Sequence, residues 1–323
     1  MGPPVGIVAA ETNMKVFSGS SHPALTAAIC QHLGIPVGKS RLVKFSNENM
    51  KVRIEENVRE ADVFVVQTSC PPVSDNLLEL LITIDALRGA SARRITAVLP
   101  YYAYVRSDKK DEPRISITAR LVADLLETAG ANRVLTLDLH SPQVQGFFRI
   151  PADQLTATPI LVEHFRQRPD LADHVVVAPD AGEVKDAARF AKRLGVPLAI
   201  VDKRRYGDDE QAHAVTLVGD VKGKRALVID DEIATGGTVL QAVDFLRREG
   251  VKDVSVAVIH PVLSGQAVER LRAAPIAELV ITDSIPLPPA KQDPRFTILS
   301  VARLVAEAIA RVHDGRSISE MYD

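Results

Sequence analysis

The sequence predicts an α/β fold with two tandem related domains, each a mainly parallel sheet flanked by helices. Three observations lead to this prediction: apolar strands alternate with helical segments, the strands are mostly apolar without a polar residue at every second position, and short motifs of the first half recur in the second. Continuous apolar strands separated by helices are typical of parallel strands covered on both faces.

The expected strands are short runs rich in β-branched residues. Between them, residues 77–87 and 239–246 place apolar side chains at three- and four-residue spacing, which indicates helices with one buried face. Strand and helix therefore alternate along the chain. The strand runs are residues 62–66, 94–99, 133–137, 174–178, 225–229 and 254–259.

Two short motifs recur at nearly the same spacing and in the same order. Residues 33–36 (Leu-Gly-Ile-Pro) return as residues 194–197 (Leu-Gly-Val-Pro), and residues 85–88 (Asp-Ala-Leu-Arg) return as residues 244–247 (Asp-Phe-Leu-Arg). Their agreement in register predicts an internal duplication of an α/β unit.

The duplication sets the expected domain bounds. We expect a first domain over residues 1–150 and a second over residues 151–300, with the C-terminal helix near 301–323 as a candidate to pack on the first. The chain of 323 residues is long enough to give each domain its own core.

Composition excludes several classes of function. Aromatic residues make up 4% of the chain, with no Trp, and the net charge is −2, so we expect no nucleic-acid partner. The chain shows no apolar run of membrane-spanning length and no leader pattern, which predicts a cytoplasmic protein without a membrane partner. Cys30 and Cys70 lie too far apart in sequence to suggest a zinc site or a disulfide framework.

The segment of residues 230–238 carries the clearest chemistry. It follows an apolar strand with two aspartates and a Thr-Gly-Gly-Thr turn, and the helical pattern resumes at Val239. Glycines at a helix N-terminus allow backbone N–H groups and hydroxyls to surround a phosphate, whereas ionised carboxylates accept from sugar hydroxyls or bind hydrated magnesium. No Lys follows the second glycine, so the segment is not a nucleotide P-loop. The pattern predicts a site for a phosphorylated pentose.

Residues 228–238 resemble the phosphoribosyl-diphosphate loop of type I phosphoribosyltransferases and ribose-phosphate diphosphokinases. Four more segments, residues 100–110, 138–148, 177–183 and 201–205, resemble the diphosphokinases in particular. This resemblance implies a type I phosphoribosyltransferase-like fold in both halves. It also implies an enzyme that transfers the diphosphoryl group of ATP to the C1 hydroxyl of ribose 5-phosphate.

The resemblance also implies which residues form the site, with Mg²⁺ as the cofactor. Lys203 and Arg205 would be catalytic, and His140 and Asp180 would be metal-associated. The ribose-5-phosphate site would be Asp230, Asp231, Ala234, Thr235, Gly236, Gly237 and Thr238. The ATP site would be Phe45, Asn47, Glu48, Asn49, Arg106, Ser107 and Asp108.

The sequence departs from the family pattern at several of these positions. Asn47 and Asn49 stand where carboxylates are usual, and Ser107 stands where Gln is usual, so nucleotide preference is open. Ala234 replaces an aspartate that is common in the synthetases. We hypothesise that the two aspartates of the loop suffice.

Two other functions share parts of this pattern. A phosphoribosyltransferase acting on a base needs the same loop but not Arg106 or Lys203. An inactive, synthetase-associated regulatory subunit would keep the fold and lose the metal-binding and cationic residues, which this chain retains. The resemblance further implies a homo-oligomer built from dimers, up to hexameric rings.

Overall fold

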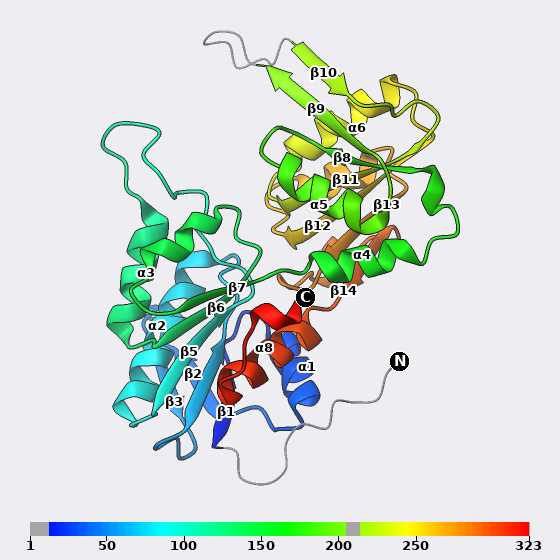
Figure 1. Cartoon of the computed structure of the whole chain (residues 1–323). Helices are drawn as coiled ribbons and strands as arrows, with labels where there is room; N and C mark the ends of the chain where they lie inside the picture. The colour runs from blue at the N-terminus through cyan, green and yellow to red at the C-terminus, as the bar shows by residue number, and fades with distance from the viewer. Residues whose placement is uncertain (1–12, 205–213, 323) are drawn as a thin grey trace. The chain divides into compact units, whose positions relative to one another are not determined.

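The computed structural model describes residues 13–204 and 214–322 and divides the chain into two compact units. Among the described residues, unit 1 contains those up to Thr156, Ser284–Pro286 and those from Ser300 onward. Unit 2 contains Ala157–Asp283 and Leu287–Leu299. Each unit is an α/β structure with its own sheet (Figure 1), so the predicted fold class is confirmed.

Unit 1 has a five-stranded sheet in the order β1-β4-β5-β6-β7, and every neighbouring pair in it is parallel. A separate antiparallel hairpin is formed by β2 and β3. Helix α1 packs against α8, and α2 packs against α3. The strands are β1 (Met14–Ser18), β2 (Ser40–Lys44), β3 (Met50–Ile54), β4 (Asp62–Val66), β5 (Arg94–Leu99), β6 (Arg133–Leu137) and β7 (Ala152–Leu155). The helices are α1 (Pro23–Leu33), α2 (Val73–Gly89), α3 (Thr118–Ala129) and α8 (Ala302–Asp314), with short 3-10 helices η1 (Pro142–Phe147) and η4 (Ser319–Met321).

Unit 2 has a seven-stranded sheet in the order β10-β9-β8-β11-β12-β13-β14, in which only the β10–β9 pair is antiparallel. Helix α4 packs against α5, and α6 packs on β11 and β12. The strands are β8 (His174–Ala178), β9 (Leu198–Arg204), β10 (Ala214–Val218), β11 (Arg225–Ile233), β12 (Asp253–Pro261), β13 (Glu278–Thr282) and β14 (Phe296–Leu299). The helices are α4 (Thr158–Arg166), α5 (Val184–Leu194), α6 (Gly237–Arg248) and α7 (Ala267–Ala273), with η2 (Leu171–Asp173) and η3 (Pro289–Lys291).

The same strand order occurs in both units, as an internal duplication requires. The order β1-β4-β5-β6-β7 of unit 1 returns as β8-β11-β12-β13-β14 in unit 2, and in each unit an antiparallel strand pair comes after the helix that follows the first of these strands. The repeated Leu-Gly motif has one structural role in both copies. Gly34 ends α1 and Gly195 ends α5, each in the left-handed conformation with φ of 70° and 73°. Only glycine adopts this conformation without steric cost, which accounts for its recurrence.

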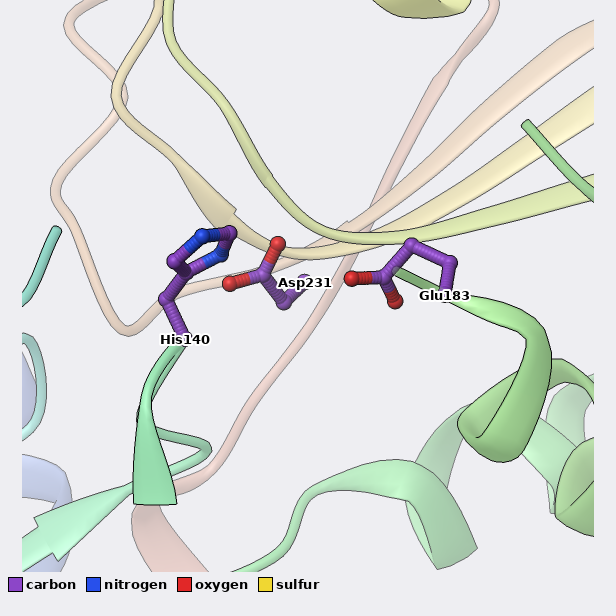
Figure 2. Close-up of side chains that lie close together, drawn as sticks. All are labelled: His140, Glu183 and Asp231. Carbon is purple, nitrogen blue, oxygen red and sulfur yellow. The ribbon is translucent and has the colours of Figure 1, made fainter. Parts of the chain in front are cut away.

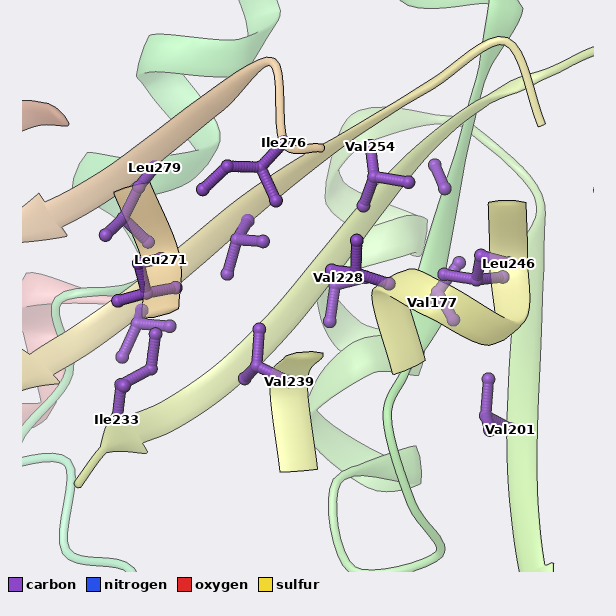
Figure 3. Packing of buried hydrophobic residues seen from close by; sticks show 14 of the residues in the cluster. Val177, Val201, Val228, Ile233, Val239, Leu246, Val254, Leu271, Ile276 and Leu279 are labelled. Atoms are coloured by element: carbon purple, nitrogen blue, oxygen red, sulfur yellow. The ribbon is translucent and has the colours of Figure 1, made fainter. Parts of the chain in front are cut away.

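Burial explains the apolar strands. All five residues of β4 and all five of β8 are buried, because helices cover both faces of each sheet. In unit 2, side chains of β8, β11, β12 and β13 pack against those of α6 and α7 in one apolar cluster (Figure 3). This cluster supports the carboxyl end of β11, where the candidate site begins.

The C-terminal helix α8 belongs to unit 1, where buried polar residues help to hold it. Asp62 is fully buried at the start of β4, and it accepts from Arg94 Nε at 2.7 Å. His313 of α8 lies with Nδ1 at 2.7 Å from the same carboxylate, and Arg94 also donates to the carbonyl of Val312 at 2.9 Å. No helix among residues 13–204 and 214–322 is long and apolar enough to cross a membrane.

Candidate functional site

The strand that precedes the loop is longer than its apolar run. We predicted a strand over residues 225–229, but β11 continues to Ile233, and α6 begins at Gly237 rather than at Val239. The reason is the neighbouring strand: β12 pairs with β11 as far as Ile233 with Pro261, while pairing with β8 stops at Val228. From Ile229 onward, β11 is therefore paired with β12 and no longer with β8.

This extension places two carboxylates at the carboxyl edge of the sheet, where α/β proteins bind ligands. Asp230 and Asp231 are half-buried, whereas Glu232 is buried. The Asp231 N–H donates to Asp230 Oδ1 at 2.9 Å, which orients the first carboxylate.

The Thr-Gly-Gly-Thr turn forms the N-terminus of α6. Gly236 is its N-cap, with φ of 79°, and its carbonyl accepts the first helical bond from Leu240 N–H at 3.0 Å. Thr235 and Thr238 are exposed. The first turn of α6, which the structure describes in full, carries no acidic residue, so the helix dipole stays favourable for an anion.

A group of carboxylates surrounds the start of this loop within unit 2. The pKa of Asp230 is raised above its ordinary value, first because the carboxyl is buried and then because Asp231, Glu183 and Asp180 repel its charge. A carboxylate oxygen of Glu183 lies within 4.8 Å of one of Asp231. Figure 2 shows these two side chains; the third that it draws, His140, belongs to unit 1.

The predicted metal residue Asp180 organises the turn before α5. Its Oδ1 accepts from the N–H groups of Gly182 at 2.9 Å and Glu183 at 3.4 Å. The sequence interpretation had missed Glu183 as a site residue. The available signal was its position, three residues after Asp180 and immediately before the helix.

These carboxylates fit Mg²⁺. Burial and carboxylate repulsion are the causes that raise the Asp230 pKa, and a divalent cation would offset them by stabilising the ionised carboxylates. Oxygen ligands from one or two carboxylates are also what Mg²⁺ takes in proteins. The donor set of unit 2 therefore suits this hard cation.

His140, the other predicted metal residue, is an exposed residue of unit 1 that follows β6. The strand ends at Leu137 because Asp138 has a left-handed φ of 31°. Asp138 Oδ1 accepts from Thr156 Oγ1 at 2.8 Å. His140 therefore lies in the loop after β6 and not on the strand itself.

The first predicted ATP segment is the tip of the β2–β3 hairpin in unit 1. Phe45 N–H donates to the Asn49 carbonyl at 2.8 Å, and Glu48, at φ 66°, closes the turn on Phe45. Asn47 Oδ1 accepts from Asn49 N–H at 3.2 Å. The side chain of Phe45 is 48% exposed, so the hairpin presents an aromatic ring to its surroundings.

The second ATP segment lies between β5 and α3. Arg106 is exposed, whereas Ser107 helps to start α3: its Oγ accepts from Thr118 N–H and donates to the Ser116 carbonyl, both at 3.2 Å. Asp108 accepts from the side-chain amide of Gln143. Ser107 therefore has a structural role in the loop that carries Arg106.

One of the two predicted catalytic cations is part of β9, which runs to Arg204. Lys203 lies on β9, where its backbone pairs with Val215 of β10. Arg205 lies outside the described residues.

Unit 1 has a different structure at the place that corresponds to the loop of unit 2. Gln67 follows β4, and its side chain accepts from Ser21 Oγ at 2.6 Å and donates to Glu79 at 2.9 Å. Pro71 and Pro72 precede α2 and have no N–H to offer an anion. A pocket of about 290 Å³ nearby is lined by side chains that include Glu79. This half lacks the carboxylate pair and the glycine turn, so it is not equipped to bind a phosphosugar in the same way.

Comparison with known proteins identifies the relatives of the chain. Residues 14–130 match the N-terminal domain of ribose phosphate pyrophosphokinase, and residues 208–323 match the phosphoribosyl synthetase-associated domain. The chain is 50% identical to a ribose-phosphate pyrophosphokinase of Deinococcus radiodurans over 96% of this chain and 98% of that protein. It is 48% identical to the Bacillus caldolyticus enzyme of the same name, with the same coverage of both chains. The crystal structure of phosphoribosylpyrophosphate synthetase from Mycobacterium smegmatis matches with a TM-score of 0.89 and 43% identity, covering 94% of this chain and all of that one (100%).

Proposed function

Because the chain belongs to the ribose-phosphate pyrophosphokinase family, we propose that residues 230–238 hold ribose 5-phosphate while unit 1 supplies contacts to the nucleotide. The protein is an enzyme that makes 5-phosphoribosyl 1-diphosphate. The C1 hydroxyl oxygen of ribose 5-phosphate attacks the β-phosphorus of ATP and the hydroxyl proton is released. The bond from that phosphorus to the oxygen that bridges it to the α-phosphorus breaks, and AMP leaves with this oxygen.

One observation supports this assignment more than any other. A carboxylate pair at the end of a parallel strand is followed directly by a glycine turn that begins a helix. Thr235, Gly236, Gly237 and Thr238 would bind the 5-phosphate, since the helix dipole and nearby hydroxyls favour an anion there. Ala234 precedes this turn and offers only its backbone.

The carboxylates at the start of the loop would bind the ribose part of the substrate. Asp230 and Asp231 would accept hydrogen bonds from the ribose hydroxyls, with a cation reducing their mutual repulsion. Asp180 and Glu183 would hold Mg²⁺ from the neighbouring strand end, and we retain His140 of unit 1 as a further metal-associated residue. When bound, Mg²⁺ would neutralise phosphate charge.

Cations and the hairpin of unit 1 complete the proposed site. Lys203 and Arg205 would stabilise the charge that develops on the oxygen between the α- and β-phosphorus, which is the main contribution a protein can make to phosphoryl transfer. The nucleotide would be bound by Phe45, Asn47, Glu48, Asn49, Arg106, Ser107 and Asp108. The exposed ring of Phe45 suits stacking on a base.

Large apolar side chains exposed on two contacting helices of unit 1 favour assembly. Leu78 of α2 and Leu121 of α3 are each 50% exposed, and Leu125 is 38% exposed. Large exposed apolar side chains on adjacent helices are typical of protein–protein interfaces, and we propose a cytoplasmic homo-oligomer built from dimers, up to hexamers. Light scattering of the purified protein tests this, and a monomer that persists at high concentration would exclude it.

A product assay tests the function. The purified chain, ATP, Mg²⁺ and ribose 5-phosphate should yield AMP, whereas a phosphoribosyltransferase acting on a base would release inorganic diphosphate from 5-phosphoribosyl 1-diphosphate. Repeating the assay with dATP, GTP and CTP measures the nucleotide preference that Asn47 and Asn49 leave open. Lys203→Ala should lose turnover by orders of magnitude and retain substrate binding. An inactive wild type that binds a partner enzyme would favour the regulatory alternative.

A further inference from the structure

The turn after β12 holds the start of the loop in unit 2. Leu263 N–H donates to the Ile233 carbonyl and Ser264 N–H donates to the Ala234 carbonyl, both at 2.9 Å. These bonds continue where the strand ladder ends, at Ile233 paired with Pro261. The two carbonyls that immediately precede Thr235 are thus fixed by this turn.

Leu263 adopts an uncommon backbone conformation. Its φ is 46°, in the left-handed region, although the residue is not glycine and its side chain is fully buried. That side chain belongs to the apolar cluster that also contains Ile233 and Val239. A strained residue of this kind persists only where its surroundings hold it in place.

Lys291 provides such support. Its Nζ donates to the Leu263 carbonyl at 2.7 Å. That carbonyl and the Ser264 N–H belong to one peptide group, so an ammonium group that donates to the carbonyl oxygen polarises the peptide and strengthens the N–H as a donor to Ala234. The ammonium therefore acts on the loop through a single peptide group.

Lys291 is itself held in position. It ends η3, and its N–H donates to the Pro288 carbonyl at 2.9 Å. Arg272 donates to the carbonyls on both sides of it, at 2.9 Å to Ala290 and 2.7 Å to Gln292. The segment is anchored independently of the loop that it supports.

We propose that Lys291 is a positioning residue for ribose 5-phosphate, acting through the Leu263–Ser264 peptide on Ala234 and the turn after it. The inference rests on the proposed function of residues 230–238. Since the chain of bonds ends at Ala234, removing the ammonium alters the ribose-5-phosphate site and leaves the nucleotide contacts of unit 1 unchanged.

Two substitutions at this position test the proposal in the full-length enzyme. Lys291→Met keeps the length and apolar stem of the side chain and removes the donor, whereas Lys291→Arg keeps a charged donor. Lys291→Met should raise KM for ribose 5-phosphate by up to about tenfold, the lower end for a hydrogen bond to a charged group, because Lys291 acts through one peptide group and not on the substrate itself. KM for ATP should stay within about twofold, and Lys291→Arg should recover most of the loss. Lys222→Met, at an exposed lysine before β11, is the matched control.

The outcomes separate this proposal from the one on which it rests. Equal rises in both KM values, or a wild-type KM for ribose 5-phosphate in Lys291→Met, would overturn the positioning role. A wild type that makes no AMP would overturn the function instead. In that case, calorimetric titration of ribose 5-phosphate into the same variants still tests Lys291. An affinity unaffected by Lys291→Met would exclude its role.

Discussion

Alanine substitutions at the two glycines of the loop should have different effects: one should lower the stability of the protein and the other should weaken ribose-5-phosphate binding. Gly236 has φ of 79°, which an L-residue adopts at a cost of about 1–2 kcal/mol. A Cβ added there would meet Leu240 Cδ1 at 3.5 Å, an ordinary contact, so backbone strain is the whole expected cost. Gly236→Ala should therefore lower the free energy of unfolding by that amount.

Gly237 has no such constraint. Its φ is not positive, and the nearest described atom to an added Cβ is Thr235 Oγ1 at 3.9 Å. Gly237→Ala should fold as stably as the wild type. The methyl would nevertheless occupy the space beside the Thr235 hydroxyl into which we place the phosphate. Losing one charge-assisted bond there weakens ribose-5-phosphate binding by roughly 10- to 150-fold.

Two measurements on each variant check this pair. Thermal unfolding without ligand, at one fixed protein concentration, should lower the midpoint by about 2–8 °C for Gly236→Ala and leave Gly237→Ala near the wild type. Calorimetric titration of ribose 5-phosphate should show the large loss of affinity in Gly237→Ala. Wild-type affinity in that variant would refute the assignment of the phosphate to this turn, and an unchanged midpoint in Gly236→Ala would refute the strain argument.

Three further predictions concern other parts of the chain. Asp62→Asn should destabilise the protein by about 3 kcal/mol, the lower end for breaking a buried ion pair because Arg94 is partly exposed. Lys44→Ala, at an exposed ion pair, should change the stability much less, and urea unfolding of both variants compares them. Burial raises the pKa of Cys30 to about 11, so iodoacetamide at pH 8 should alkylate it roughly a hundredfold more slowly than an unfolded-state thiol, and rapid labelling in the native protein would contradict this. Glu183→Gln should weaken Mg²⁺ binding by at least about tenfold, measured as a smaller rise in the thermal midpoint with added Mg²⁺, and an undiminished rise would exclude Glu183 as a ligand.

Local patterns predicted most of the architecture. Strands buried on both faces need apolar residues on both faces, and residues 62–66 and 174–178, which are apolar after the first residue of each run, show this pattern. The ends of helices and strands were harder to predict, because they depend on the neighbouring strands. For example, β11 continues to Ile233 because β12 pairs with it that far. The apolar run at residues 225–229 carries no sign of that partner.

Some parts of the candidate site could be predicted from the sequence and others could not. The turn at Gly236 was visible because a glycine pair before a helical pattern has a local conformational meaning. Glu183 was not visible, since a single glutamate before a helix is ordinary in sequence. Its significance comes from β8 lying beside β11, which brings the end of one strand to the end of the other. Lys291 was missed for the same reason: it contacts Leu263 across 28 residues of sequence.

The sequence by itself determined the α/β class, the duplicated plan and the position of the glycine turn to which we assign the phosphosugar. Each of these follows from periodicity, from recurring motifs or from the conformational freedom of glycine, and all of them act over a few neighbouring residues. The tertiary structure decided which carboxylates share the end of the sheet with Asp231 and which side chain supports the peptide beneath the loop. Those contacts depend on strand order and on chain returns over long separations, and no local pattern of residues specifies them.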